Sequence, residues 1–129
     1  MITEDYVSFE VAKLLKEKGF DGECDYLYVN GNIVRAQGYR CNWNKGETIF
    51  ADYKNECSAP TLQLAMKWLR EVHKWHIEIS RGEYGYFVHI VSAKNLSTEN
   101  YTVQLEGGYN LSYEEACEAA IRYCLENLI

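Results

Sequence analysis

The fold of this 129-residue chain is decided by the stretch Thr61-Leu-Gln-Leu-Ala-Met-Lys-Trp-Leu-Arg-Glu-Val-His-Lys-Trp-His-Ile-Glu-Ile-Ser80. Its first part repeats apolar residues at helical spacing, and from Trp75 onward apolar and polar residues alternate. The first pattern predicts a helix that opens at Pro60-Thr61, and the second predicts a strand. Because a helix and the next strand must each bury one face, we expect Trp68 and Trp75 to be core residues rather than a platform for a ligand or a base.

The same patterns continue in both directions from this stretch. Toward the N-terminus they predict a helix from Ser8 to Gly19 and a hairpin that turns at Asn30-Gly31. Toward the C-terminus they predict a helix that begins at Ser112 with a capping box. The expected strands are residues 26–29, 33–36, 48–53, 75–80 and 84–91, and the region of Tyr101, Val103 and Leu105.

The predicted order of elements is α-β-β-β-α-β-β-β-α, which indicates an α+β fold. We expect residues 1–129 to form a single domain in which antiparallel sheets have helices packed on one face. The helix starts share a hydroxyl residue, a large apolar or aromatic residue, Glu or Gln, any residue and Ala, at residues 8–12, 61–65 and 112–116. This pattern is consistent with an internal duplication of an α-β-β-β unit, and equally with ordinary helix-start chemistry.

Composition and charge restrict the kinds of partner. The formal net charge is −6 at pH 7, and an acidic chain repels nucleic acid and anionic membranes. No apolar run approaches the roughly 20 residues of a membrane helix, and no secretory signal pattern is present. We therefore expect a cytoplasmic protein with no membrane partner. The five cysteines are an odd number without a C-x-x-C pair, which favours reduced thiols.

Three segments together form a recognisable signature, namely Tyr6-Val-Ser-Phe-Glu-Val-Ala-Lys-Leu-Leu-Lys-Glu-Lys-Gly-Phe20, Ala59-Pro-Thr-Leu-Gln-Leu-Ala-Met-Lys-Trp-Leu-Arg-Glu71 and Tyr113-Glu-Glu-Ala-Cys-Glu-Ala-Ala-Ile-Arg-Tyr-Cys-Leu-Glu-Asn-Leu-Ile129. In these segments the chain resembles a family of small uncharacterised proteins from phages and prophages of gut bacteria. The resemblance implies a mobile-element accessory protein in bacterial cytoplasm. It implies no activity, cofactor or site residue.

The turn at residues 40–45 is the candidate partner-binding site. Its tryptophan stands between two asparagines and two cations, and tryptophan and arginine are the residues most enriched at binding hot spots. We expect the tryptophan to be exposed, because a polar turn does not easily reach a core; the alternative is that it folds back over an edge of the sheet. The predicted contact residues are Arg35, Arg40, Trp43, Lys45 and Lys54.

One group of residues has the chemistry of a metal site. With Gly82-Glu83 as a two-residue turn, His76 faces His89 across the hairpin, and Glu78 lies on the same side. Two imidazoles and a carboxylate are acceptable zinc ligands, although no fourth ligand can be named. The alternative is a partly exposed polar face of a sheet.

The sequence contains no motif of a known catalytic class. G-x-S-x-G, a phosphate-binding glycine loop, H-E-x-x-H and C-x-x-C are all absent, and Cys117 and Cys124 lie on the apolar face of a helix, where thiols are buried and inert. Residues 8–74 have the element order of double-stranded-RNA-binding domains, but neither later helix has the basic N-terminus by which such domains grip phosphates.

These observations favour a non-enzymatic accessory protein that binds an unidentified protein partner and needs no cofactor. Two alternatives stay open. One is a metal-dependent or acid–base enzyme that uses the face formed by His76, Glu78 and His89. The other is an acidic mimic of nucleic acid that uses the carboxylates of the last helix. The oligomeric state cannot be predicted from the sequence.

Overall fold

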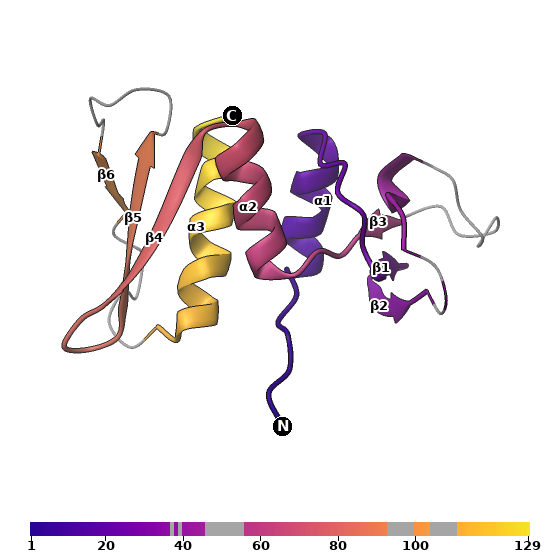
Figure 1. The fold of residues 1–129 in the computed structure, drawn as a ribbon, viewed down its shortest axis with the longest axis horizontal. Coiled ribbons are helices and arrows are strands. Elements are labelled where there is room, and N and C mark those ends of the chain that lie inside the picture. Colours follow the sequence, from indigo (N-terminus) through magenta and orange to yellow (C-terminus); the bar gives the residue numbers. More distant parts are fainter. Residues whose placement is uncertain (37, 39, 46–55, 93–99, 104–110) are drawn as a thin grey trace. The chain divides into compact units, whose positions relative to one another are not determined.

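The computed structural model describes residues 1–36, 38, 40–45, 56–92, 100–103 and 111–129. Its elements, shown in Figure 1, are α1 (Phe9–Glu17), β1 (Tyr26–Val29), β2 (Asn32–Arg35), the 3-10 helix η1 (Trp43–Lys45), β3 (Cys57–Ser58), α2 (Leu62–Val72), β4 (Trp75–Arg81), β5 (Tyr86–Ser92), β6 (Asn100–Val103) and α3 (Tyr113–Asn127). The fold is α+β, and its helices and strands follow the predicted order.

The chain divides into two compact units, Met1–Leu64 and Ala65–Ile129. Each unit contains one three-stranded antiparallel sheet. Across the described part of the chain, no helix combines the length and the apolar character that crossing a membrane requires.

Helix α1 of the first unit begins and ends as the sequence predicts. The Ser8 hydroxyl accepts a 3.2 Å hydrogen bond from the backbone N–H of Val11, which satisfies a free donor of the first turn. At the other end, Gly19 has a φ of 88°, a conformation that costs glycine little. The N–H of Phe20 then donates to the Leu15 carbonyl at 2.9 Å. This ending directs the Phe20 side chain, which is 2% exposed, back into the core.

The sheet of the first unit has the strand order β2-β1-β3. The β1–β2 hairpin turns at Asn30 and Gly31, whose φ angles are 51° and 81°. Two successive positive φ values define a type I′ turn, which Asn-Gly tolerates and which matches the twist of the strands. Strand β3 pairs with the other edge of β1. The predicted strand at residues 48–53 lies outside the described residues.

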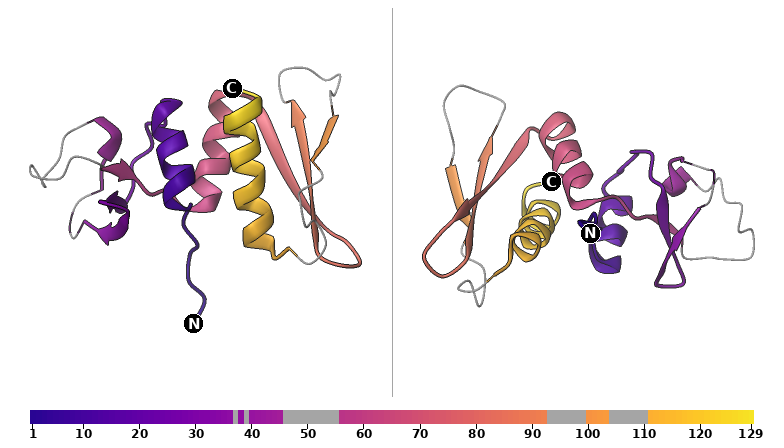
Figure 2. Two further views of the ribbon diagram at one scale, coloured as in Figure 1. Left: turned by 180° about the vertical axis from the view of Figure 1, so that it is seen from behind. Right: turned by 60° about the horizontal axis from the view of Figure 1, so that its bottom comes forward.

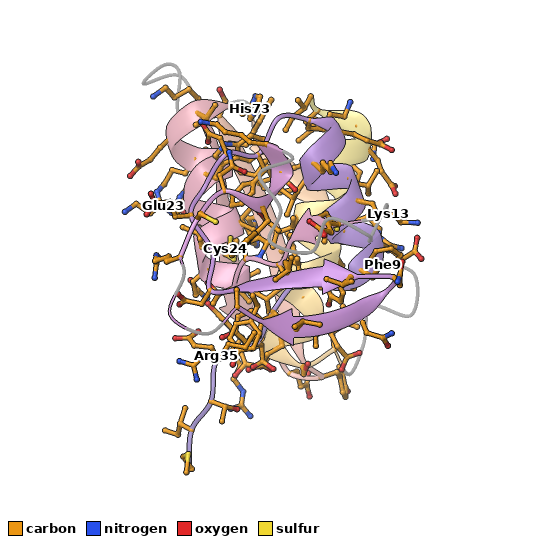
Figure 3. The ribbon with its side chains drawn as sticks, turned by 90° about the vertical axis from the view of Figure 1, so that its right-hand side faces the viewer. Phe9, Lys13, Glu23, Cys24, Arg35 and His73 are labelled. Carbon is orange, nitrogen blue, oxygen red and sulfur yellow. The ribbon has the colours of Figure 1, made fainter. Side chains whose placement is uncertain are left out.

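Helix α1 and an extended N-terminal segment cover this sheet. The Phe9 ring packs against Tyr28 with centroids 5.3 Å apart, and the Lys13 ammonium lies 4.7 Å from the Phe9 centroid. Figure 3 shows Phe9 and Lys13 together on α1 beside the hairpin. The Val7 N–H donates to the Pro60 carbonyl at 3.1 Å, and the Val7 carbonyl accepts from the Tyr28 hydroxyl at 2.7 Å. These bonds hold the chain that enters α1 against the chain that enters α2.

Helix α2 begins slightly later than predicted. The Thr61 hydroxyl accepts from the Leu64 N–H at 3.1 Å, so Thr61 is the cap and Pro60 precedes the helix instead of opening it. The prediction that Trp68 is a core residue is confirmed, since 7% of it is exposed. Its ring meets the His73 ring edge-on, with centroids 4.6 Å apart. Trp75, the other expected core tryptophan, is half-buried.

The sheet of the second unit is a meander with the order β4-β5-β6. Figures 1 and 2 show that α3 lies along one face of this sheet. The central side chains of β4 and β5 that point toward this face are buried, with exposed fractions of 6% for Ile77, 1% for Val88 and 0% for Ile90, whereas Ile79 is half-buried. On α3 the matching buried residues are Ala116, Cys117, Ala120, Ile121, Cys124 and Leu125.

The predicted two-residue turn between β4 and β5 is wrong. The loop has four residues, 82–85, and a 2.7 Å hydrogen bond joins its first N–H to its last carbonyl. Ile79 therefore lies opposite Val88 instead of Tyr86, and every pair is shifted by two residues. Because an even shift keeps each side chain on its own face, the predicted division into buried and outward residues is unchanged.

The two sheets differ in connectivity. In the first unit the central strand is the first of the three, β1, whereas in the second unit it is the second, β5. A simple duplication of an α-β-β-β unit predicts the same strand order in both sheets. The predicted third strand of the first unit, residues 48–53, lies outside the described residues, so the duplication hypothesis stays a prediction, while each of the shared helix starts carries a hydroxyl cap.

Helix α3 supplies a test of that capping chemistry. The Ser112 hydroxyl accepts from the Glu115 N–H at 3.1 Å, and the Glu115 carboxylate accepts from the Ser112 N–H at 3.4 Å. We expect Ser112→Ala to lower the free energy of unfolding by about 1 kcal/mol, since it removes the cap, and Ser112→Asp to retain most of the stability. Urea unfolding followed by circular dichroism measures both. Equal losses in the two variants would contradict the role of the cap.

Candidate functional site

The predicted contact turn is a buried part of the first unit. Trp43 is 1% exposed. Its indole Nε1 donates to the Cys24 carbonyl at 2.8 Å, and its backbone N–H donates to the Ser58 Oγ at 3.0 Å. The expectation of an exposed tryptophan is therefore wrong. The 3-10 turn of η1 brings the ring inward, where its one polar atom finds an acceptor and its apolar body leaves water.

The flanking asparagines are structural as well. The Asn42 Oδ1 accepts from the Asn44 N–H at 3.0 Å, which shapes the turn. The Asn44 side chain donates to the Phe20 carbonyl at 3.0 Å and accepts from the Ser58 N–H at 2.9 Å. Asn44 thus joins the end of α1 to β3, and its amide is already engaged within the unit.

The predicted cations have different surroundings. Arg35, Arg40 and Lys45 are exposed, whereas Lys54 lies outside the described residues. The Arg40 Nη1 is 3.4 Å from the Asp25 Oδ2, so this charge is partly compensated. Arg35 is at the end of β2, as Figure 3 shows. Contact with a partner stays a prediction for the three exposed cations, without the tryptophan that was expected to anchor it.

The second candidate, the metal site, is not assembled. Because the β4–β5 loop has four residues, His89 lies opposite Glu78, and His76 lies opposite Val91. The His76 Nε2 is 3.6 Å from the Glu78 Oε1. Within the described ranges, no three His, Cys, Asp or Glu side chains form a group that could hold a metal ion. The predicted opposition of His76 and His89 is therefore wrong, and the three side chains lie on a partly exposed polar face of the sheet, as the alternative prediction has it.

The face that carries these residues also carries an aromatic side chain that sequence reasoning missed. We define the outer face as the side of β4 and β5 that points away from α3, formed by His76, Glu78, Ser80, Phe87, His89 and Val91. Phe87 is 44% exposed, and Tyr84 in the adjacent loop is 59% exposed. The alternation that directs Glu78 and His89 outward also directs Phe87 outward. That signal was present in the sequence.

The position of Phe87 is determined by the loop beside it. Its ring lies directly over Gly82, where a Cβ atom would overlap the ring carbons. On the inner side of the same strand, the Tyr86 ring meets Tyr113 of α3 edge-on, with centroids 5.6 Å apart. Neighbouring aromatic residues of β5 thus point in opposite directions, one into the unit and one outward.

Four of the five thiols have raised pKa values, which lowers their reactivity at neutral pH. Burial raises the pKa of Cys24 and of Cys124 to about 12, and it raises the pKa of Cys57 and of Cys117 to about 11. All four are therefore protonated at neutral pH, and a thiol is a weak nucleophile compared with a thiolate. The prediction that Cys117 and Cys124 are buried is confirmed.

Comparison of the chain with protein-family models, with curated proteins and with solved structures found no match.

The burial of Trp43 predicts a large effect on stability. We expect Trp43→Ala to lower the free energy of unfolding by about 3–5 kcal/mol, because it removes a buried aromatic ring. Lys45→Ala, in the same turn but exposed, should change it by less than about 0.5 kcal/mol. Urea unfolding of both variants measures the difference. A Trp43→Ala protein as stable as the Lys45→Ala protein would contradict the buried position of the indole.

The raised thiol pKa values predict a loss of stability in alkali. Unfolded thiols ionise near pH 9.0, but Cys117 and Cys124 ionise only near 11 and 12 in the folded protein. The contribution of these two thiols to the free energy of unfolding is complete below pH 9. It declines as the pH rises toward 11, because the unfolded state then binds fewer protons than the folded state. From pH 7 to about 10, the free energy of unfolding of the wild type should therefore fall by about 2–3 kcal/mol more than that of a Cys117→Ala/Cys124→Ala variant. Equal losses of unfolding free energy in the wild type and the double variant would contradict the raised pKa values of Cys117 and Cys124.

Proposed function

We propose that the protein is a non-enzymatic binding module whose outer face contacts a protein partner. The observation that carries this proposal is the exposure of Phe87, 44% of which is in contact with water on the outer face. A large aromatic side chain that is held outward by the backbone beneath it can bind with little loss of conformational freedom. Tyr84, at 59% exposure, extends the aromatic surface into the adjacent loop.

Charge favours a protein partner over a nucleic acid. Residues 75–129 contain three basic and eight acidic side chains, so phosphates are repelled from this part of the chain. The outer face itself combines one apolar ring with a carboxylate, Glu78, and two histidines, His76 and His89. A partner with an apolar pocket bordered by basic side chains complements this set of groups.

The exposed cations of the first unit are a second, less supported contact. Arg35 and Lys45 are exposed, and Arg40 is engaged with Asp25. They have no exposed tryptophan beside them, since Trp43 is buried. Rim charges of this kind change association rate and salt dependence more than affinity. We therefore place the anchor of the interface on Phe87 and not on residues 40–45.

The biological setting belongs to the same proposal. The resemblance of the three helical segments to phage and prophage proteins supports an accessory role in a mobile element within bacterial cytoplasm. In that setting the partner is a host or phage protein. The proposal has no cofactor, and it leaves the oligomeric state open.

The test uses two equally exposed apolar residues. Phe87 on β5 and Ile33 on β2 are both 44% exposed. Tagged wild-type, Phe87→Ser and Ile33→Ser proteins are used to capture partners from the native host, and bound proteins are quantified by mass spectrometry. The affinity of the recovered partner is then measured with purified proteins. We expect Phe87→Ser to weaken binding by about tenfold or more, as loss of a hot-spot aromatic does, while Ile33→Ser binds like the wild type.

Two results would contradict the proposal. The first is an affinity that is unchanged in Phe87→Ser, or reduced equally by Ile33→Ser. The second is recovery of partners that are nucleic-acid-binding proteins and that nucleic acid displaces from this protein. That result would favour the acidic-mimic alternative. Thermal unfolding of each variant provides the folding control, because substitution of an exposed side chain should change stability by less than about 1 kcal/mol.

A further inference from the structure

Two cysteines of the first unit lie directly opposite one another. Cys24 and Cys41 form an antiparallel bridge outside the named strands. The Cys24 N–H donates to the Cys41 carbonyl at 3.0 Å, and the Cys41 N–H donates to the Cys24 carbonyl at 3.4 Å. The two residues thus exchange both backbone hydrogen bonds, which is the arrangement of a hydrogen-bonded pair in an antiparallel ladder.

The backbone spacing of this arrangement is compatible with a disulfide. The Cα atoms of a hydrogen-bonded antiparallel pair are about 5.5 Å apart, within the range of about 4.4–6.8 Å that disulfides span. The side chains of such a pair point to the same side of the ribbon. Other cysteines of the chain have different neighbours: Cys57 lies opposite Tyr28, and Cys117 and Cys124 are two turns apart along α3. Two turns of helix separate Cα atoms by about 10 Å, which is too far for a disulfide.

We propose that Cys24 and Cys41 form a dithiol site that closes to an intramolecular disulfide by exchange with a low-molecular-weight disulfide of the glutathione class. The site lies in the first unit and does not depend on the proposed binding role of the outer face. It adds a covalent modification, with a defined co-reactant, to a chain whose cysteines are all free.

The two thiols have different roles in this exchange because their accessibilities differ. Cys41 is partly exposed, whereas Cys24 is buried with 3% exposure. Cys41 is therefore the thiol that meets the external disulfide, and Cys24 is the thiol that resolves the intermediate. The Cys24 Sγ lies 3.7 Å from the Gly22 carbonyl, to which it donates in the reduced state.

Charges beside the pair affect the second step. Burial raises the pKa of Cys24 to about 12, while Ser58 and the guanidinium of Arg40 lower it, and Asp25 raises it further. Arg40 and Asp25 are themselves paired at 3.4 Å. The raised pKa therefore slows the attack by Cys24 at neutral pH, and this step accelerates as the pH rises toward that pKa.

The exchange is balanced in atoms and electrons. The Cys41 thiolate attacks one sulfur of oxidised glutathione, forming a protein–glutathione disulfide and releasing one glutathione thiolate. The Cys24 thiolate then attacks the Cys41 Sγ, forming the Cys24–Cys41 bond and releasing the second glutathione. The protein loses two electrons and two protons, and one glutathione disulfide becomes two thiols.

Closure has a direct structural consequence. The bond links the segment that enters β1 to the segment that enters η1, and it encloses the β1–β2 hairpin in a covalent loop. Trp43 is two residues beyond Cys41, and its indole is bonded to the Cys24 carbonyl. The disulfide therefore fixes both sides of the indole contact and limits the freedom of the unfolded chain.

The test counts thiols in the intact chain. Native protein is incubated with oxidised glutathione, quenched with acid, alkylated in denaturant and weighed by mass spectrometry. We expect the alkylatable thiols to fall from five to three, with the loss of two hydrogens and no retained glutathione. Peptide mapping without reductant should join the Cys24 peptide to the Cys41 peptide, and reductant should restore all five thiols.

Single variants assign the two steps. Cys41→Ala should keep its four remaining thiols, and Cys24→Ser should hold one glutathione on Cys41, because no resolving thiol is present. The matched control is Cys117→Ala, which should still lose two thiols. Circular dichroism confirms that each variant is folded. The peptide map of the wild-type protein identifies the joined cysteines independently of any variant. The proposal is overturned if the wild type keeps five thiols, stops at the glutathione adduct, or joins any other pair of cysteines.

Discussion

The first unit depends on the burial of one indole. Removing the Trp43 ring from water is favourable only if its N–H finds an acceptor, and the Cys24 carbonyl supplies one at 2.8 Å. Ser58 then binds the backbone of the same residue, and Asn44 joins the end of α1 to β3. The polar turn at residues 42–45 thereby holds together the end of α1, the segment at Cys24 and strand β3. The Cys24–Cys41 bridge lies beside this contact, so backbone pairing and side-chain burial support one another.

The second unit separates its structural and exposed residues by strand alternation. One side of β4 and β5 is covered by α3, and Ile77, Val88 and Ile90 on this side are almost fully buried. The other side combines Phe87 with histidines and a carboxylate. The same groups that were considered as zinc ligands therefore lie on the same face as an exposed ring.

Most of the fold could be predicted, because its signals are local. The cap at Ser8, the Asn30-Gly31 turn and the capping box at Ser112 depend on residues within one turn of each other. The length of the β4–β5 loop could not, since Gly82-Glu83 fits a shorter turn equally well. The burial of Trp43 could not be predicted either, because its acceptor is nineteen residues away in the chain. The opposition of Cys24 and Cys41 is equally non-local, whereas the outward direction of Phe87 followed from alternation and was overlooked.

Gly82 illustrates how a half-buried glycine can be required for a reason other than backbone conformation. Unlike Gly31, its φ is not in the left-handed region; what it provides is the empty space that the Phe87 ring occupies. A side chain at residue 82 would therefore require the Phe87 ring to move from its present position. The direction of an aromatic residue on a strand is thus set by a residue of the neighbouring loop.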